Sequence, residues 1–486
     1  MRTIIVFFDS LNRRMLSPYG CEWVKTPNFD RLAKHSVTFD SSFVGSMPCI
    51  PARHDLHTGR LNFLHRSWGP MEPYDNSVFS ILKDNGIYTH LISDHMHYWE
   101  DGGSNYHTKY SSWEIVRGQE GDLWKAHVGE FPDTSKMLGR NDYVRARDII
   151  NRKYMKESED FPIHKVFSLG LEFLKKNVEQ DNWVLQIESF DPHEPFFAHE
   201  IYKSLYPDDY ASEEFDWPDY KKVDETPEQV QHAILQYASL VSACDDYLGK
   251  VLDFMDENNM WDDTMLIVCT DHGYLLGEHG WWAKSRQPLY NEISNTPFFV
   301  WDPRCKVQNE RRSQLVQLID IAPTLLEAYH IDIPDTMQGV SLYDCIKNNG
   351  KTRGSIMFGI HGCHVNLTDG RYVYMRAPLE GNKPLYDYTL MPADMKKPFN
   401  EERLRQAELA EPFSFTKGMP QLKVPAREWS PIDFKEYGTL LFDLKNDSHQ
   451  LNPILDSEIE NKMIDLLKKM MRENDCPEEQ FIRLGL

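Results

Sequence analysis

The sequence predicts an α/β fold: a large mixed, mostly parallel sheet flanked by helices, with a smaller C-terminal antiparallel sheet plus helix. Three features indicate this fold. Apolar runs alternate with helical patterns over about the first 330 residues, an order typical of a parallel sheet with helices on its faces. Four of these runs lead into Asp or His, at the strand ends where open α/β sheets place their sites. After about residue 350, short strand-like runs follow one another.

The elements of the main sheet follow from apolar periodicity and from turn residues at their ends. The predicted strands span residues 3–8, 88–92, 183–188, 265–270 and 297–301. The predicted helices span residues 27–35, 76–85, 163–176, 227–257 and 315–329. We expect Thr26 to cap the first helix with Pro27 at its first position. Gly86 should end the second helix.

The C-terminal part should form a separate small unit. Its predicted strands span 355–360, 364–367, 371–376 and 439–444, and its final helix spans 459–472. We therefore expect a catalytic α/β domain over residues 1–350 and a small α+β subdomain over 351–486. Residues 118–160 and 203–228 are predicted to be surface excursions. The second, which is acidic and rich in Tyr, Trp and Pro, is either a solvated loop or the rim of a substrate pocket.

Composition narrows the choice of function and location. The net charge of −22, with no basic run, argues against nucleic acid as a partner, and any anionic substrate would need local cations. The sequence has no run of some 18 apolar residues, which argues against a membrane span. The first apolar run is too short for a signal peptide, so we expect a cytoplasmic location. The eight scattered cysteines favour neither a disulfide framework nor a zinc finger.

Ligand-type residues gather at the ends of four predicted strands. They are Asp9, the pair Asp94-His95, the pair Asp191 and His193, and the pair Asp271-His272. The carboxyl ends of parallel strands meet at one edge of a sheet, so we expect a shared site there. Carboxylates and imidazoles without a cysteine pair favour Ca²⁺, Mg²⁺ or Mn²⁺.

A possible nucleophile lies in the segment Cys49-Ile50-Pro51-Ala52-Arg53, where the cysteine precedes a helix-like stretch. The N-terminus of a helix favours bound anions and activated nucleophiles. The planar guanidinium of Arg53 suits an oxyanion. The alternative is a buried structural cysteine at a turn.

With these motifs in order, the sequence resembles the type I (formylglycine-dependent) sulfatases of the alkaline phosphatase superfamily. The C-x-P-x-R pattern at Cys49–Arg53 looks like the signature of that family, and the match runs in the same order from residue 3 to about 455. Further segments carry the resemblance: TPNFDRL at 26–32, LHTGR at 56–60, DPHEPF at 191–196, TDHG at 270–273, GEHG at 277–280 with Lys284, DIAPTLL at 320–326, TDGRY at 368–372 and LFDL at 441–444.

The resemblance implies a cofactor and a set of roles. Cys49 would be converted to formylglycine by a separate formylglycine-generating maturation enzyme. One divalent cation, Ca²⁺ before Mg²⁺ or Mn²⁺, would be bound by the ligand set Asp9, modified Cys49, Asp271 and His272. Arg53 would orient the formylglycine, while His193 and Lys284 would hold the sulfate or assist the leaving oxygen.

The sequence departs from the usual family pattern in three places. Asp9 is followed by Ser10 rather than by a second Asp, and Asp271 by His272 rather than by Asn. Both departures resemble the phosphonate monoester and phosphodiester hydrolase branch. The third is the absence of a lysine around 93–97, where either His95 or His97 could face the substrate.

The predicted function is hydrolysis of sulfate esters through a formylglycine hydrate at position 49. The expected partner is a small anionic sulfated substrate, either a sulfated carbohydrate or a small aryl sulfate. Two alternatives remain open. One is a phosphonate monoester or phosphodiester hydrolase that uses the same site, and the other is a catalytically silent anion-binding protein whose Cys49 stays a thiol.

Overall fold

A computed structural model describes residues 1–102, 105–394, 396–427 and 434–486 and centres on an eight-stranded sheet. The strand order is β12-β2-β11-β8-β1-β7-β5-β6. The strands are β1 (Arg2–Phe8), β2 (Val37–Phe39), β5 (Tyr88–Ser93), β6 (Ser112–Ile115), β7 (Trp183–Ser189), β8 (Thr264–Thr270), β11 (Phe298–Trp301) and β12 (Glu310–Arg312). Strands β6, β5, β7, β1 and β8 run parallel, whereas β11 is antiparallel to both of its neighbours. The predicted mixed, mostly parallel sheet is thus confirmed.

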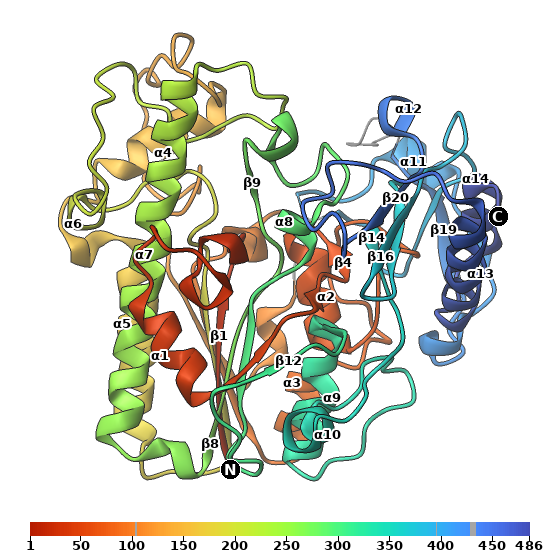
Figure 1. Cartoon of the computed structure of the whole chain (residues 1–486), viewed down its shortest axis with the longest axis horizontal. Helices are drawn as coiled ribbons and strands as arrows, with labels where there is room; N and C mark the ends of the chain where they lie inside the picture. The colour runs from red at the N-terminus through yellow and green to blue at the C-terminus, as the bar shows by residue number, and fades with distance from the viewer. Residues whose placement is uncertain (103–104, 395, 428–433) are drawn as a thin grey trace.

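Helices cover both faces of this sheet (Figure 1). One face carries α1 (Pro27–His35), α5 (Pro162–Asn177) and α7 (Pro227–Glu257), and the other carries α2 (Cys49–Thr58), α3 (Val78–Asp84), α9 (Ile321–Ala328) and α10 (Tyr343–Asn348). Alternate side chains of β1 enter two separate cores: Ile4, Val6 and Phe8 pack on the first face, Ile5 and Phe7 on the second. Because helices bury both faces, the central strands are apolar throughout rather than alternating.

Most predicted elements of the main sheet are confirmed, and two helices match residue for residue. α1 begins at Pro27, although the Thr26 hydroxyl accepts a hydrogen bond from the Ser17 amide at 3.0 Å rather than from the helix. α7 begins with a capping box in which Thr226 and Gln229 bond each other's backbone amides. The second predicted helix starts at Val78 rather than at residue 76.

Two predictions were wrong in detail. The helix expected from residue 315 begins only at Ile321, after the short strand β13 (Val316–Gln317) and a 3-10 turn. β13 pairs with β3 (Ser42–Phe43), so tertiary pairing prevails there over helical periodicity. The excursion 118–160 contains a further helix, α4 (Tyr143–Arg152). Its apolar periodicity is weak because it buries Arg145 in an ion pair with Asp216 at 2.8 Å instead of an apolar side chain.

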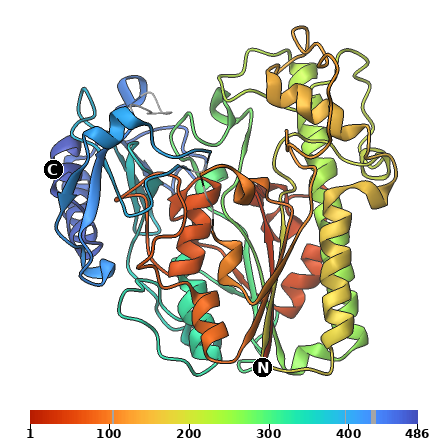
Figure 2. The same ribbon diagram turned by 180° about the vertical axis from the view of Figure 1, so that it is seen from behind.

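The C-terminal part forms the predicted antiparallel sheet with one unexpected strand. Its order is β20-β16-β15-β14-β4, from β14 (Ile356–Ile360), β15 (Val365–Thr368), β16 (Tyr372–Arg376), β20 (Leu440–Asp443) and β4 (Ser46–Met47). The last strand comes from the N-terminal part and runs parallel to β14. Helix α13 (Ser457–Glu473) packs on this sheet, as Figure 2 shows from behind. The strand that leads into Cys49 therefore belongs to the C-terminal sheet.

A second small sheet was not predicted. It has the order β17-β19-β18 and consists of β17 (Tyr386–Thr389), β18 (Glu408–Ala410) and β19 (Gln421–Pro425). The chain ends in α14 (Glu478–Leu484). The domain boundary at residue 350 stays a prediction. Each described helix is too short or too polar to cross a membrane.

Candidate active site

Cys49 is the first residue of α2, and the turn that leads to it is held by Asp55 one helical turn further on. The Asp55 carboxylate accepts hydrogen bonds from the Ser46 amide at 2.6 Å and from the Ser46 hydroxyl at 2.8 Å. A side chain at Gly45 would approach Asp55 Oδ2 to 2.3 Å, so glycine is required there. Burial raises the pKa of Asp55 to about 8. These bonds fix β4 against α2 and so fix the position of Cys49.

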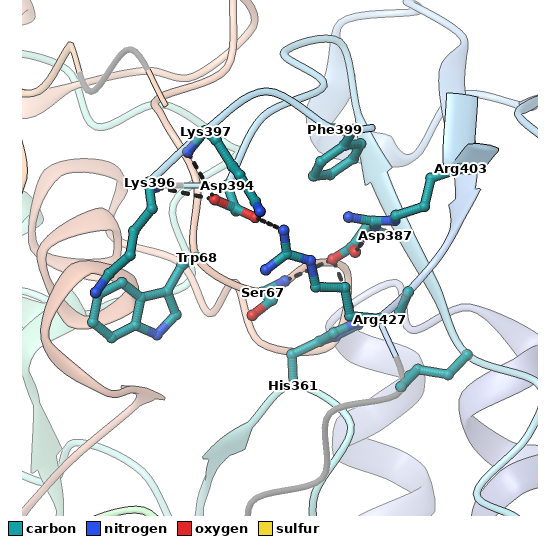
Figure 3. Close-up of a pocket in the computed structure, with 12 residues that line it drawn as sticks. Ser67, Trp68, His361, Asp387, Asp394, Lys396, Lys397, Phe399, Arg403 and Arg427 are labelled. Atoms are coloured by element: carbon teal, nitrogen blue, oxygen red, sulfur yellow. Dashed lines mark hydrogen bonds and ion pairs between the residues drawn. The ribbon is translucent and has the colours of Figure 1, made fainter. Parts of the chain in front are cut away.

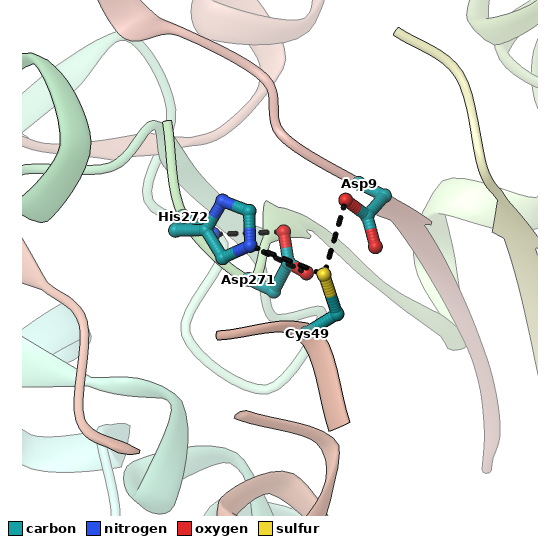
Figure 4. Close-up of side chains that lie close together, drawn as sticks. All are labelled: Asp9, Cys49, Asp271 and His272. Atoms are coloured by element: carbon teal, nitrogen blue, oxygen red, sulfur yellow. Dashed lines mark hydrogen bonds and ion pairs between the residues drawn. The ribbon is translucent and has the colours of Figure 1, made fainter. Parts of the chain in front are cut away.

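Four side chains from three elements meet at Cys49 (Figure 4). Asp9 follows β1, Asp271 and His272 follow β8, and one ligand atom of each of the four lies within 4.8 Å of the others. The Cys49 Sγ atom is 3.4 Å from His272 Nε2 and 3.8 Å from Asp9 Oδ1. His272 Nδ1 lies 2.9 Å from the Gly273 carbonyl oxygen and must donate to it, so Nε2 presents a lone pair to the cluster.

Arg53 neutralises the carboxylates around this cluster. Its Nη1 lies 2.8 Å from Asp271 Oδ2, its Nη2 lies 3.0 Å from Asp9 Oδ2, and its Nε donates to Glu188 Oε1 at 2.7 Å. Nη1 also donates to the Cys49 carbonyl oxygen at 2.9 Å. Burial alone would lower the pKa of Arg53, but the charges of Glu188, Asp9 and Asp271 raise it well above its usual value. Arg53 is therefore charged and joins residue 49 to three strand ends.

The Cys49 thiol is not an activated nucleophile in this environment. Burial and the neighbouring charge of Asp9 raise the pKa of Cys49 well above its usual value. We expected the N-terminus of α2 to activate the thiol, but burial and the charge of Asp9 outweigh that effect. Chemistry at this position requires either a different group or a different charge environment.

Lys284 is a second cation next to the cluster. Its Nζ donates to Ser10 Oγ at 2.9 Å and lies 3.7 Å from Cys49 Sγ. Burial would lower the pKa of Lys284, but the charges of Glu194 and Asp9 raise it. A buried, fixed ammonium group next to position 49 supplies the local positive charge that an anionic substrate needs in this acidic chain.

His193 lies in a loop held by two further carboxyl groups. Its Nδ1 is 2.6 Å from the Glu194 carbonyl oxygen and 3.3 Å from Glu194 Oε2. Asp94 Oδ1 accepts from the Phe190 amide at 2.7 Å, and Phe190 packs on the His193 ring at a centroid distance of 4.1 Å. Burial raises the pKa of Asp94 well above its usual value.

The two histidines that the sequence left undecided lie at different depths. His95 is fully buried, and neither of its ring nitrogens has a hydrogen-bond partner within the described part of the chain. Burial and then the charge of Arg53 lower the pKa of His95 well below its usual value. The centroids of the His95 and His97 rings are 5.1 Å apart, and His97 Nδ1 is 2.9 Å from Glu100 Oε2.

The donor set fits a divalent metal ion. Two carboxylates and one imidazole are offered by buried residues, together with whatever group residue 49 presents. Although Arg53 Nη2 lies 3.0 Å from Asp9 Oδ2, the two atoms are not aligned for a hydrogen bond, and both lack a partner within the described residues. A buried carboxylate oxygen without a hydrogen bond is expected where an ion binds.

Sequence reasoning missed four residues of this site. Glu188 pairs with Arg53, Glu194 lies between His193 and Lys284, Tyr220 donates to Glu194 Oε1 at 2.5 Å, and Ser10 accepts from Lys284. Only Glu188 carried a signal, because an acidic residue in an otherwise apolar parallel strand needs a buried partner. The roles of these residues and of the predicted site residues stay predictions.

Comparisons with known proteins agree on one family. The family model described as Sulfatase matches residues 2–331, and the one described as N-sulphoglucosamine sulphohydrolase, C-terminal, matches residues 277–406. The arylsulfatase of Clostridium perfringens is 24% identical over 394 residues, which are 74% of this chain and 81% of that protein. The N-acetylglucosamine-6-O-sulfatase of Bacteroides thetaiotaomicron is 22% identical over 411 residues, 72% of this chain and 71% of that protein.

Solved structures show the same fold. One is described as a complex with its substrate D-glucosamine-2-N,6-O-disulfate and superposes with a TM-score of 0.66 at 15% identity, covering 97% of both chains. The phosphonate monoester hydrolase of Agrobacterium radiobacter also gives a TM-score of 0.66, at 17% identity, over 97% of this chain and 95% of that one.

Proposed function

The chain belongs to the sulfatase family, whose reaction is the hydrolysis of sulfate esters, and we propose that it cleaves a sulfated carbohydrate or a small aryl sulfate at Cys49. The observation that carries this proposal is the convergence of Asp9, Asp271 and His272 on residue 49, with Arg53 and Lys284 next to them. Two fixed cations and a metal-type donor set form a buried site for a small anionic ester group.

The proposal includes one covalent modification of the chain and one bound metal ion. A formylglycine-generating enzyme oxidises Cys49, and one divalent cation, Ca²⁺ before Mg²⁺ or Mn²⁺, binds to Asp9, residue 49, Asp271 and His272. Oxygen and imidazole donors support these hard cations. When bound, the cation would offset charge on the sulfate oxygens and lower the pKa of a hydroxyl at residue 49.

The residues of the chain supply the remaining functions. Arg53 orients residue 49 through its carbonyl oxygen, and Lys284 holds a sulfate oxygen through Nζ, which lies 3.7 Å from Cys49 Sγ. His193 donates through Nδ1 to the Glu194 carbonyl, which leaves Nε2 to deliver a proton to the leaving alcohol. Glu194 Oε2 lies 3.3 Å from the same Nδ1 atom. Of the two undecided histidines, His95 faces the sulfate, because its buried nitrogens are unpartnered within the described chain.

The test is turnover by the matured enzyme. We expect the protein, coexpressed with a formylglycine-generating enzyme, to show the mass loss of thiol-to-aldehyde conversion in the peptide that contains residue 49. It should then hydrolyse 4-nitrophenyl sulfate, whereas Cys49→Ala, which cannot be converted, should not. Full conversion without turnover of any sulfate ester would contradict the proposal. Full thiol retention in the native host, again without turnover, would favour the silent anion-binding protein.

The phosphonate monoester or phosphodiester hydrolase is the second candidate. Asp9-Ser10 and Asp271-His272 favour it, as does the similarity of fold to the phosphonate monoester hydrolase. Comparing kcat/KM on 4-nitrophenyl sulfate and on a 4-nitrophenyl phosphonate monoester separates the two readings. A large preference for the phosphonate would replace our first choice.

A further inference from the structure

A cavity of about 730 Å³ lies beside the candidate active site, between the segment after α2 and the small sheet β17-β19-β18. Figure 3 shows Lys397 and Arg427 near its middle, Trp68 and Lys396 on one side, and Phe399 and Arg403 on the other. A cavity of this size accommodates one or two sugar rings. Its lining combines aromatic faces with charged groups, as carbohydrate ligands require.

The charge of this lining is opposite to that of the chain. Four cationic side chains and two carboxylates face the cavity, in a protein of net charge −22. The arginines are paired within the lining: Arg403 lies 2.7 Å from Asp387, and Arg427 lies 2.7 Å from Asp394. The excess positive charge therefore belongs to the two lysines.

Lys396 and Lys397 are the cations available to a ligand. Lys396 Nζ is 4.0 Å from Glu100 Oε1, too far for a hydrogen bond, and its side chain is 65% exposed. The ammonium group of Lys397 has no partner among the residues that the structure describes. Asp394 accepts hydrogen bonds from both lysine backbone amides at 3.0 Å.

A short series of contacts joins the cavity to the candidate active site. Trp68 packs edge-on against His97 at a centroid distance of 5.4 Å, and His97 lies 5.1 Å from His95. Glu100 bonds His97 Nδ1 and also faces Lys396. Packed side chains thus link the cavity to His95 through Trp68 and His97.

We propose that this cavity binds a second anionic group of the substrate, a sulfate or a carboxylate on a sugar ring, through Lys396 and Lys397. The inference rests on the proposed function and deepens it, because it selects a multiply charged carbohydrate over a small aryl sulfate. An aryl sulfate carries only the charge that the site at Cys49 already neutralises. The indole of Trp68 then supplies the apolar face against which the sugar ring lies.

The test compares singly and doubly charged substrates. The substrates are 4-nitrophenyl sulfate, N-acetyl-D-glucosamine 6-sulfate, D-glucosamine 2-N,6-O-disulfate and a sulfated disaccharide with a uronate. For the matured enzyme we expect kcat/KM on a doubly charged sugar to exceed that on a singly charged one by about tenfold, the effect of a charged hydrogen bond. The variant Lys396→Ala/Lys397→Ala should lose this preference and keep its kcat/KM on 4-nitrophenyl sulfate within about twofold, whereas Lys397→Arg should retain most of the preference.

Controls separate this inference from the proposed function. Lys351→Ala removes an exposed lysine outside the cavity and should leave kcat/KM unchanged on both singly and doubly charged substrates. Calorimetric titration of Cys49→Ala with D-glucosamine 2-N,6-O-disulfate should show about tenfold weaker binding when both lysines are also replaced. If the double lysine variant loses kcat/KM equally on all substrates, or on none, the cavity proposal is overturned while sulfatase activity stays in place. Absence of 4-nitrophenyl sulfate turnover would instead count against the proposed function.

Discussion

The guanidinium of Arg53 contacts three carboxylates from three separate strands: Asp9 after β1, Glu188 in β7 and Asp271 after β8. None of these four side chains is exposed to solvent. Removal of one partner from a buried ion pair leaves an uncompensated charge, which costs more than the pair itself contributes. Arg53 therefore stabilises the fold as well as orienting residue 49.

Replacement of Arg53 should be strongly destabilising. We expect Arg53→Met, which keeps the length of the side chain but not its charge, to lower the free energy of unfolding by about 3–5 kcal/mol. The free energy of unfolding of Arg53→Lys should lie between those of Arg53→Met and the parent, because one ammonium group cannot reach three carboxylates. Urea denaturation followed by circular dichroism measures both. The matched control is Arg31→Met, whose exposed pairs with Asp253 and Asp256 should be worth less than about 1 kcal/mol. If Arg53→Met lowers the free energy of unfolding no more than this control does, the account of Arg53 is wrong.

Lys284 should affect catalysis more than folding. In the proposed reaction its Nζ lies where charge develops on the sulfate, and loss of one fixed donor to such charge reduces rates by about 100-fold. We expect Lys284→Ala to lower kcat/KM on 4-nitrophenyl sulfate by about that factor. Lys176→Ala, at a surface lysine of α5, should leave kcat/KM unchanged. A Lys284→Ala enzyme with nearly full activity would remove Lys284 from the site.

At the scale of elements, the turn from β4 into α2 fixes the position of Cys49, and one carboxyl group holds that turn. Burial raises the pKa of Asp55 to about 8, far above the value of an unfolded chain. The folded state therefore binds a proton that the unfolded state has released, and stability falls as the pH rises between these two values. The contribution is fully present at pH values below the unfolded pKa.

This titration predicts the behaviour of a neutral replacement. Asp55→Asn keeps an acceptor for the Ser46 amide but cannot ionise. We expect its free energy of unfolding to fall less steeply than that of the parent from about pH 4 to pH 8. Urea denaturation at a series of pH values measures the two slopes. Parallel slopes for parent and variant would show that Asp55 does not titrate in this range.

Sequence patterns anticipated elements with strong periodicity and failed where long-range pairing decides. Five of the eight strands of the main sheet and helices α1 and α7 were predictable, because apolar runs and N-terminal caps are local signals. The start of α9 was not, because β13 forms only by pairing with β3. The pairing of β4 with β14 could not be predicted either, since it joins residues about 310 positions apart.

The same division applies to the site. The grouping of Asp9, Asp271 and His272 followed from their place after parallel strands. The links through Glu188, Glu194 and Tyr220 could not be foreseen, because a sequence does not show which buried acid pairs with which cation. The choice between His95 and His97 likewise needed the structure. A sequence does not show which ring nitrogens are buried without a hydrogen-bond partner, as those of His95 are among the described residues.

At the scale of the whole molecule, an acidic protein concentrates positive charge at one end of its sheet. Arg53 and Lys284 lie at residue 49, and Lys396 and Lys397 lie in the neighbouring cavity. The two groups are far apart in the sequence and are brought together because the C-terminal sheet incorporates β4. Together with the proposed divalent cation, they would attract an anionic substrate locally although the molecule as a whole repels it.

The bound cation should stabilise the entire molecule, because its ligands come from the ends of β1 and β8 and from the start of α2. Anything that binds only the folded state adds to its stability, by about 2.7 kcal/mol at a ligand concentration 100 times the dissociation constant. We expect the matured protein, stripped with a chelator, to lose activity and to melt at a lower temperature. Ca²⁺ should restore both more effectively than Mg²⁺ or Mn²⁺, whereas Asp271→Asn, which lacks one charged ligand, should respond weakly to all three. Differential scanning calorimetry with parallel turnover assays measures the shifts. A melting temperature and a turnover rate that none of the three cations changes would contradict the proposal of a metal ion at this site.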